Sequence, residues 1–464
     1  MQLDSLLSVV RDTPHYRALI ETLRNGHRAP DQHLLRAARP FMIAALARDL
    51  NRALIIVTAQ VERAYNIAEQ LPVWLPNVPV LRFAEPSAIF YDRTPWATNT
   101  MRTRVSALAA LCPPIGVEAG TPPVIVTSAY ALMQRTLPPR EFRVGSRVLK
   151  RSQQADPDKL LRSWLSLGYT PASIVTEPGT FSRRGGIIDI FPTAMLSPVR
   201  IEFFGDEIDS LRTFDPATQR SAETIDRVII TPAREAIPKY GGAVADRLAG
   251  WFATLPNPDD DVTSAQPDEA DLRSETAFPL LDFYLPYLYS APASLLDYAP
   301  DDALIVVEDW EALTDTVADL ESQALSQRAD KSAVQLPADM PLPYITWDDL
   351  QESISERKVL HLGGSEIPDD SDDPDQTVSE RTEQGTLGDL FAPARRYGGQ
   401  LRTFLESLQK VTRRDESAIV ITRQALRIAE LWEQHSGLRV APTDDLTEVP
   451  ALGKVAFIEG AITE

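Results

Sequence analysis

The stretch from Pro178 to Ser221, PGTFSRRGGIIDIFPTAMLSPVRIEFFGDEIDSLRTFDPATQRS, constrains the fold more than any other part of the chain. A glycine-rich turn leads into three short segments in which apolar and polar residues alternate, at 187–191, 199–204 and 207–214. Proline and acidic turn residues separate these segments. Alternation with a period of two, interrupted by turn residues, predicts a small antiparallel meander.

Alternation along the middle segment predicts one apolar face and one face that carries an arginine, a glutamate and a phenylalanine. Arg200, Glu202 and Phe204 fall on the outward face, opposite Ile201 and Phe203. Such a stripe is typical of a protein-docking surface rather than of an enzyme pocket, because arginine and aromatic side chains dominate binding hot spots. The alternative is that Phe204 belongs to the core and that the arginines are merely solvated.

The segments RRGGIIDIFP, PVRIEFFGDEIDSLRTFD and TQRS resemble the docking domain that UvrB shares with the UvrB-like module at the N-terminus of bacterial transcription-repair-coupling factors. The resemblance implies that UvrA is the partner and that its contacts fall on Arg184, Arg200 and Phe204. The glycine that follows selects Arg184 rather than Arg183. In this family the chain continues into an RNA-polymerase-binding domain and a DNA motor that uses ATP and magnesium. We therefore expect a truncated form, which would reach RNA polymerase and DNA only through those further domains.

A chain of 464 residues is too long for one core, so we expect several domains. Strand patterns at 53–59, 78–83 and 124–129 alternate with helical patterns, which predicts an α/β domain with a parallel sheet. The resemblance implies that this domain is a degenerate P-loop-NTPase-like fold, as in the first domain of UvrB, with an α+β UvrA-docking domain inserted into it. The predicted segments are 1–140 and 238–360 for the split α/β domain, 141–237 for the insert, 361–384 for an acidic linker and 385–464 for a small α/β domain.

Several local signals support this division. Asp156 and Pro157 form a good helix start and Gly168 a good stop, which predicts a helix at 157–167. The segment 295–313 reads as a strand and then a helix that completes the first sheet. The acidic segment at 257–271 has few apolar residues and is predicted to be a mobile loop.

A phosphate-binding loop is expected just ahead of the helix that leads to the first strand, where the chain reads LLRAARPFMIAAL. A P-loop needs glycines, a lysine and a hydroxyl group. This segment has no glycine, and Arg36, Arg39 and Pro40 stand about where those residues belong, so we expect no nucleotide there. Glu308 and Asp309 mimic a magnesium-binding strand end, but we interpret them as solvated loop acids.

The net charge of −20 argues against a broad nucleic-acid footprint. Basic runs at 143–151 and 410–414 are interpreted as solvated faces. The single cysteine, Cys112, is expected to be a small buried residue in a reducing cytoplasm, and no stretch is apolar enough to cross a membrane. The five histidines have no metal-ligand spacing, so we expect no metal site and no catalytic residues.

Two functions of different classes remain. The first is a binding module that recruits UvrA to stalled RNA polymerase. The second is an ATP-dependent DNA translocase or helicase, which requires a motor that these residues do not encode. The segment 385–464 could have a binding role of its own, but it carries no recognisable site.

Overall fold

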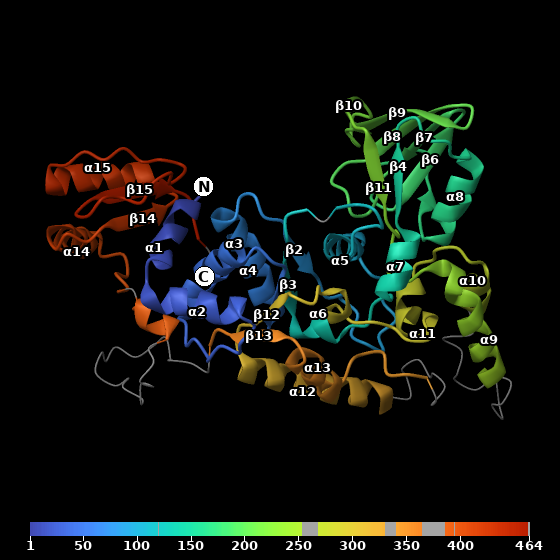
Figure 1. Ribbon diagram of the computed structural model, residues 1–464, viewed down its shortest axis with the longest axis horizontal. Helices are drawn as coiled ribbons and strands as arrows, with labels where there is room; N and C mark the ends of the chain where they lie inside the picture. Colours follow the sequence, from blue (N-terminus) through green and yellow to red (C-terminus); the bar gives the residue numbers. More distant parts are fainter. Residues whose placement is uncertain (119, 253–267, 330–339, 364–385, 394, 463–464) are drawn as a thin grey trace.

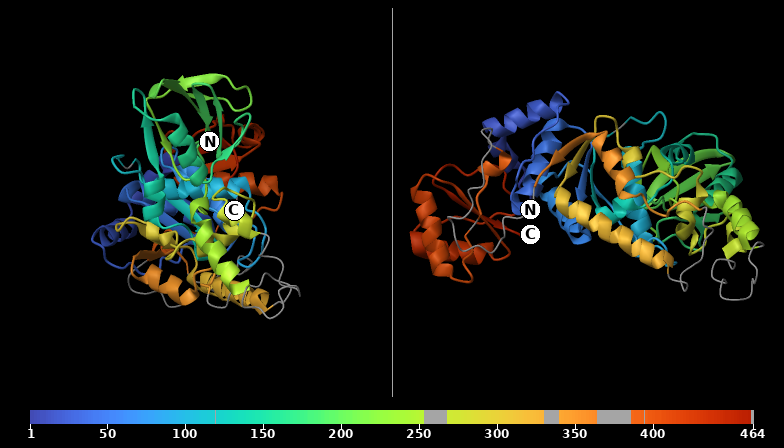
Figure 2. Two further views of the ribbon diagram at one scale, coloured as in Figure 1. Left: turned by 90° about the vertical axis from the view of Figure 1, so that its right-hand side faces the viewer. Right: turned by 90° about the horizontal axis from the view of Figure 1, so that it is seen from below.

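The computed structural model describes residues 1–118, 120–252, 268–329, 340–363, 386–393 and 395–462. Figure 1 shows a central domain, a domain that rises from one end of it, and a small domain at the other end. Figure 2 shows the same order from below, with the green and red parts of the chain on opposite sides of the blue and orange centre.

The central domain is built on a parallel sheet of five strands in the order β13-β12-β1-β3-β2. Its strands are β1 (Leu54–Thr58), β2 (Val80–Phe83), β3 (Val124–Ser128), β12 (Leu304–Val307) and β13 (Lys358–His361). The sheet therefore joins strands that lie before and after the segment 141–237. The predicted mixed α/β class with a parallel sheet is confirmed, whereas the predicted domain limits stay predictions.

Both faces of this sheet are covered, which explains the continuous apolar runs of its strands. Alternate residues of β1 enter different cores: Ile55 and Val57 contribute to one, and Leu54 and Ile56 to the other. The helices of the central domain are α1 (Leu7–Arg11), α2 (Pro14–Arg24), α3 (Arg39–Leu50), α4 (Val61–Trp74), α5 (Thr98–Leu111), α6 (Ala129–Met133), α12 (Trp310–Ala329) and α13 (Trp347–Ser355).

The rising domain contains a six-stranded sheet in the order β10-β9-β8-β7-β6-β5 (Figure 1). Its strands are β5 (Thr170–Pro171), β6 (Thr180–Arg184), β7 (Ile187–Ile190), β8 (Val199–Phe204), β9 (Glu207–Phe214) and β10 (Ser221–Thr224). Strands β7, β8 and β9 pair antiparallel, so the predicted meander is confirmed, and it extends by neighbours on both sides.

Helix α8 (Pro157–Ser166) covers the apolar face of this sheet, where Trp164 packs edge-on against Phe181. Its predicted start is confirmed, because Asp156 accepts hydrogen bonds from the backbone N–H groups of Asp158 and Lys159. The helix ends two residues before Gly168, close to the predicted stop. A second pair of strands, β4 (Arg147–Lys150) and β11 (Arg227–Ile230), and helix α7 (Pro139–Gly145) connect this domain to the centre.

A buried ion pair joins the rising domain to the central domain. Arg104 of α5 donates to Glu235, with Nε–Oε2 and Nη2–Oε1 distances of 2.5 and 2.9 Å, and both side chains are almost fully buried. The guanidinium also lies 3.8 Å from the centroid of the Phe83 ring. Because Glu235 follows β11, this pair fixes the point where the chain returns to the central domain.

Part of the predicted mobile loop at 257–271 is ordered, which corrects that prediction for residues 268–271; the rest of it lies outside the described residues. Asp268 is buried, pairs with Arg93 and accepts a hydrogen bond from the Tyr284 hydroxyl at 2.8 Å. Helices α9 (Gly241–Phe252), α10 (Glu269–Arg273) and α11 (Leu285–Leu288) lie in this region. The predicted linker at 361–384 starts too early, because His361 is the last residue of β13 and Leu362 is buried; residues 364–384 lie outside the described residues.

The small domain consists of α14 (Leu401–Arg413), β14 (Ala418–Thr422), α15 (Ala425–Ser436) and β15 (Val455–Glu459), with its two strands parallel. Trp432 and Phe457 are the largest side chains in its core. It contacts the start of the chain, where the amino group of Met1 lies 3.5 Å from Asp445 and the Leu446 N–H donates to the Gln2 carbonyl. Within the described ranges, no helix is both long and apolar enough to span a membrane.

Candidate protein-docking face

The strand register of the rising domain builds one continuous face from four strands. Arg184 of β6 lies opposite Ile187 of β7, which lies opposite Glu202 of β8, which in turn lies opposite Ser210 of β9. Directly opposed residues of antiparallel strands point to the same side of a sheet. We call this side the docking face; Phe204 belongs to it by alternation along β8.

Phe204 lies at the open end of the docking face. It is 83% exposed and precedes a two-residue turn, Gly205–Asp206, after which Glu207 pairs with it. Gly205 has a φ of 62°, which the first position of a type II′ hairpin turn requires and which glycine adopts without strain. The alternative that Phe204 is a core residue is therefore wrong, and the alternation argument that placed it outside is confirmed.

Arg200 is less open than the sequence suggested. It forms a bidentate ion pair with Asp189, with Nε–Oδ1 and Nη2–Oδ2 distances of 2.8 and 2.9 Å, and only 19% of its side chain is exposed. The hydrogen bonds that Arg200 donates to Asp189 raise the pKa of the guanidinium above its ordinary value. Arg200 is thus neither a free outward arginine nor a solvated one, because its cross-strand neighbour on β7 already binds it.

A small second core explains why this end of the docking face is closed. Phe214, Phe191 and Val175 pack together on the side that Arg200 faces, and the guanidinium lies 4.9 Å from the centroid of the Phe214 ring. The Gln219 side chain donates to the Val175 carbonyl at 3.1 Å and so ties the two covering segments together. The docking face therefore runs from a closed end at Phe214 to an open end at Phe204.

The two neighbouring arginines of β6 point to opposite sides of the sheet. Arg184 shares the docking face and donates to the Ser173 carbonyl at 3.1 Å, while the residue remains exposed. Arg183 lies opposite Ile188 on the other face and pairs with Asp158 of α8. The choice of Arg184 from its following glycine agrees with this geometry, and its role as a UvrA contact stays a prediction.

Two apolar residues near the docking face were missed. Ile187 is 39% exposed between Arg184 and Glu202, and Ile174 is 50% exposed next to Ser173, to which Arg184 is bound. Ile187 could have been found by pairing the first two meander segments across their turn. For Ile174 the sequence holds no comparable signal, because it lies in an irregular segment.

The place expected for a phosphate loop is filled by an internal ion-pair cluster. Arg39 begins α3, Pro40 follows it, and both are buried. Glu308 Oε1 lies 3.3 Å from Arg39 Nη1 and 2.5 Å from Arg63 Nε. A Cβ on Gly363 would lie 2.1 Å from Arg39 Nη2, so the backbone also approaches the cluster closely.

The cluster corrects the interpretation of Glu308 and Asp309 as solvated loop acids. Glu308 is 4% exposed and pairs with two buried arginines, and Asp309 accepts a hydrogen bond from the Ala312 N–H in the first turn of α12. Arg36 is exposed, and its carbonyl accepts a hydrogen bond from Arg63 Nη2 at 3.0 Å. Burial lowers the pKa of Arg63, although Glu308 acts in the opposite direction.

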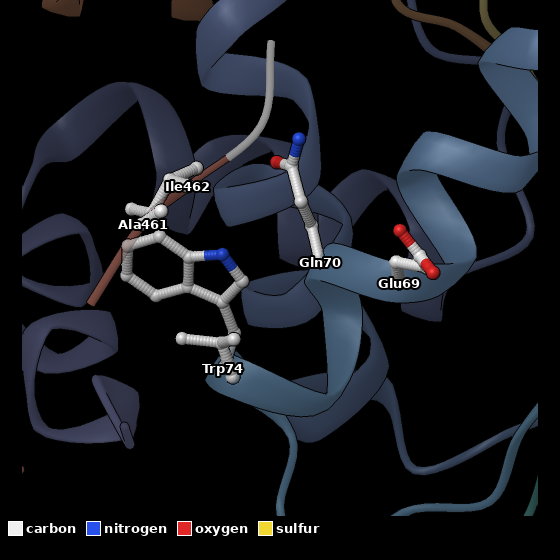
Figure 3. Close-up of a pocket in the computed structure, with 6 residues that line it drawn as sticks. Glu69, Gln70, Trp74, Ala461 and Ile462 are labelled. Carbon is white, nitrogen blue, oxygen red and sulfur yellow. The ribbon is translucent and has the colours of Figure 1, made fainter. Parts of the chain in front are cut away.

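Other candidate sites are poor. Cys112 is buried, as predicted, and burial raises the pKa of its thiol. The described residues contain no group of three or more histidine, cysteine or acidic side chains that could hold a metal ion. A pocket of about 270 Å³ lies between α4 and residues 461–462, beside Trp74 (Figure 3), and none of the predicted site residues lines it.

Comparison with known proteins agrees with this geometry. The model of the UvrB interaction domain matches residues 148–235, which include the whole docking face. A transcription-repair-coupling factor of Bacillus subtilis (strain 168) is 28% identical over 342 residues, which cover 71% of this chain and 28% of that protein. One of Myxococcus xanthus is 32% identical over 249 residues, covering 50% of this chain and 20% of that protein.

A third relative extends the similarity over nearly the whole chain. The transcription-repair-coupling factor of Staphylococcus aureus (strain MRSA252) is 22% identical over 473 residues, covering 99% of this chain and 38% of that protein. The chain thus spans between 20% and 38% of the length of these three relatives. The predicted resemblance is confirmed: the chain carries a UvrB interaction domain and is related to the transcription-repair-coupling factors.

Proposed function

We propose that this chain is a UvrA-recruiting adaptor module that acts in transcription-coupled nucleotide excision repair. The observation that carries the proposal is the docking face inside the matched UvrB interaction domain, where Phe204 is 83% exposed beside Arg184 and Ile187. A large ring held out from a strand end loses solvent-exposed area only when a partner covers it. Relatives named for coupling transcription to repair support the same role.

In this proposal the residues of the docking face have different tasks. Phe204 is the apolar anchor, Ile187 extends its contact area, and Arg184 offers a guanidinium to a carboxylate of UvrA. Arg200 acts mainly as a positioning residue, because its pair with Asp189 holds β7 and β8 together and aligns the exposed end. We propose that the module acts in the cytoplasm and that RNA polymerase and DNA are reached through regions other than the docking face.

We further propose that the central domain is a UvrB-type nucleotide fold with a degenerate phosphate loop, and that this chain does not hydrolyse ATP. In this proposal Arg39 and Glu308 stand where a P-loop lysine and a magnesium-binding acid would act; their ion pair with each other supports the loss of that function. An ATPase assay with and without DNA tests this part and the rival translocase function together. Turnover above background in the unaltered chain would favour the translocase.

Calorimetric titration with purified UvrA tests the docking proposal. We expect Phe204→Ala to weaken binding by about thirtyfold, the effect of a hot spot worth about 2 kcal/mol, and Arg184→Ala by about tenfold. Arg183→Ala is the matched control on the opposite face, and Leu196→Ala removes an exposed apolar side chain in the loop at the other end of β8. Equal losses in the controls, or no UvrA binding by the unaltered chain, would overturn the proposal.

Alanine at position 200 cannot by itself separate contact from positioning, because it leaves Asp189 buried without its counter-charge. The double variant Asp189→Asn with Arg200→Gln removes both charges. If Arg200 is a positioning residue, the double variant binds UvrA better than Arg200→Ala and its thermal stability recovers in parallel. If the double variant binds no better although its stability has recovered, Arg200 contacts UvrA directly.

A further inference from the structure

A large groove in the described part of the chain lies away from the docking face. It has a volume of about 1180 Å³ and is bordered by the loop 114–117, helix α7, strand β4, the segment 151–156 and the first half of α8. These elements gather where the rising domain joins the centre (Figure 1). Because α8 covers the face of the sheet opposite Arg184 and Phe204, the groove and the docking face are separate surfaces.

The groove is strongly basic on a chain whose net charge is −20. Six cationic residues line it, and Asp156 is the one acidic residue among its described lining residues. The six are Arg143, Arg147, Lys150, Arg151, Lys159 and Arg227. Lys159 lies 3.4 Å from Asp156, which also caps α8, whereas no ion pair in the described part of the chain includes any of the other five.

The sheet register makes this charge distribution unfavourable in the free protein. Lys150 of β4 lies directly opposite Arg227 of β11, and both are exposed. Like charges at directly opposed positions of antiparallel strands repel each other and destabilise the pair. A bound anion would relieve this repulsion, so the register of these two cations adds to the preference of the groove for an acidic ligand.

The groove also carries apolar side chains that a purely ionic ligand would leave uncovered. Ile115 is 83% exposed and Val144 is 59% exposed, and Val148 and Leu160 line the same groove. None of its described lining residues is aromatic, so bases of a single-stranded nucleic acid would have no ring to stack on.

We propose that this groove binds an acidic protein segment whose carboxylates alternate with apolar anchors. The unpaired cations would bind the carboxylates, and Ile115 and Val144 would cover the apolar side chains. The proposal goes beyond UvrA recruitment and does not rest on it, because it concerns other residues on another side of the domain.

Fluorescence anisotropy with short labelled peptides tests the groove. The first probe alternates glutamate and leucine, the second replaces each leucine by serine, and the third is a single-stranded oligodeoxynucleotide of similar charge. We expect the glutamate–leucine peptide to bind most tightly, with an affinity that falls about tenfold or more in the double variant Arg147→Glu with Arg151→Glu. The control variant is Arg423→Glu with Arg427→Glu, which makes the same charge change at two exposed positions of the small domain. It should have little effect on the affinity for the peptide.

A second variant tests the apolar part. Ile115→Ser with Val144→Ser changes only exposed side chains and should weaken the leucine peptide while leaving the serine peptide unaffected. Equal binding of the two peptides would overturn the assignment of apolar anchors. If the oligonucleotide binds more tightly than either peptide, and Arg147→Glu with Arg151→Glu abolishes that binding, the groove is a nucleic-acid site instead. If both charge-reversal variants weaken peptide binding equally, the groove is not the binding site and the proposal is wrong.

Discussion

Neutralising Glu308 should destabilise the central domain more than almost any single change at its surface. The substitution Glu308→Gln keeps the size of the side chain but leaves Arg39 and Arg63 buried without a counter-charge. The three side chains are at most 10% exposed, and both arginines approach the same oxygen, Glu308 Oε1. Because β12 and α3 meet at this cluster, the damage should spread through the parallel sheet.

The expected magnitude follows from the burial of the cluster. Removing one partner of a buried ion pair costs about 3–5 kcal/mol, because the remaining charge stays desolvated. Each kcal/mol lowers the melting temperature of a domain of this size by about 2–4 °C, so a fall of about 10 °C is expected. Replacing all three side chains by apolar ones (Arg39→Leu, Arg63→Met and Glu308→Leu) should recover most of the loss, since no buried charge remains.

Urea unfolding followed by tryptophan fluorescence measures this effect. Glu311→Gln, an exposed glutamate on the next turn of the chain, is the control and should change the free energy of unfolding by less than about 0.5 kcal/mol. A loss below about 1 kcal/mol for Glu308→Gln would refute the reasoning, because the arginines would then have to be solvated or paired in another way.

Three further predictions concern other parts of the molecule. Arg104→Met should cost about 3–5 kcal/mol in urea unfolding by leaving Glu235 buried and unpaired, and limited proteolysis should then cut near the junction of the two domains. Gly205→Ala should cost about 1–2 kcal/mol, because its φ of 62° is unfavourable for a residue with a Cβ, and Gly205→Asn should cost less in the same assay. Burial lowers the pKa of His361, so the unfolded chain takes up a proton on this histidine at a higher pH than the folded protein does. The stability of the unaltered protein relative to His361→Asn should therefore be full above pH ~6.5 and decrease below it, as measured by thermal unfolding at a series of pH values.

Sequence periodicity was sufficient to predict a helix or strand wherever the residues of that single element carry the pattern. The three meander segments at 187–191, 199–204 and 207–214 fall within a residue of β7, β8 and β9. The helix after Asp156 could be placed because a cap is a local interaction. Phe204 could be assigned to the outside because its inward neighbours already fill the apolar side of the same strand.

Contacts between residues far apart in the sequence could not be predicted from periodicity or local caps. The partner of Arg200 on the docking face is Asp189, and finding it requires the register of β7 against β8 across the loop between them. Glu308 and Arg63 lie 245 residues apart in the chain, and nothing in either local sequence indicates their contact. The same limit applies to the groove, since the basic run at 143–151 reads as a solvated face until Arg227 and the loop at 114–117 are brought beside it.

The distribution of paired and unpaired charge separates the structural parts of this chain from the parts that can bind a partner. Arg39, Arg63 and Arg104 are buried against carboxylates, so a new anion could bind them only by displacing a charge the protein already supplies. Such displacement would leave a desolvated carboxylate behind, which opposes nucleotide binding in the central domain. On the rising domain the opposite holds: Arg184 and the groove cations other than Lys159 are exposed, and a partner can bind them without breaking an ion pair found among the described residues. Partner recognition is therefore expected on the rising domain rather than at the buried ion pairs of the central domain.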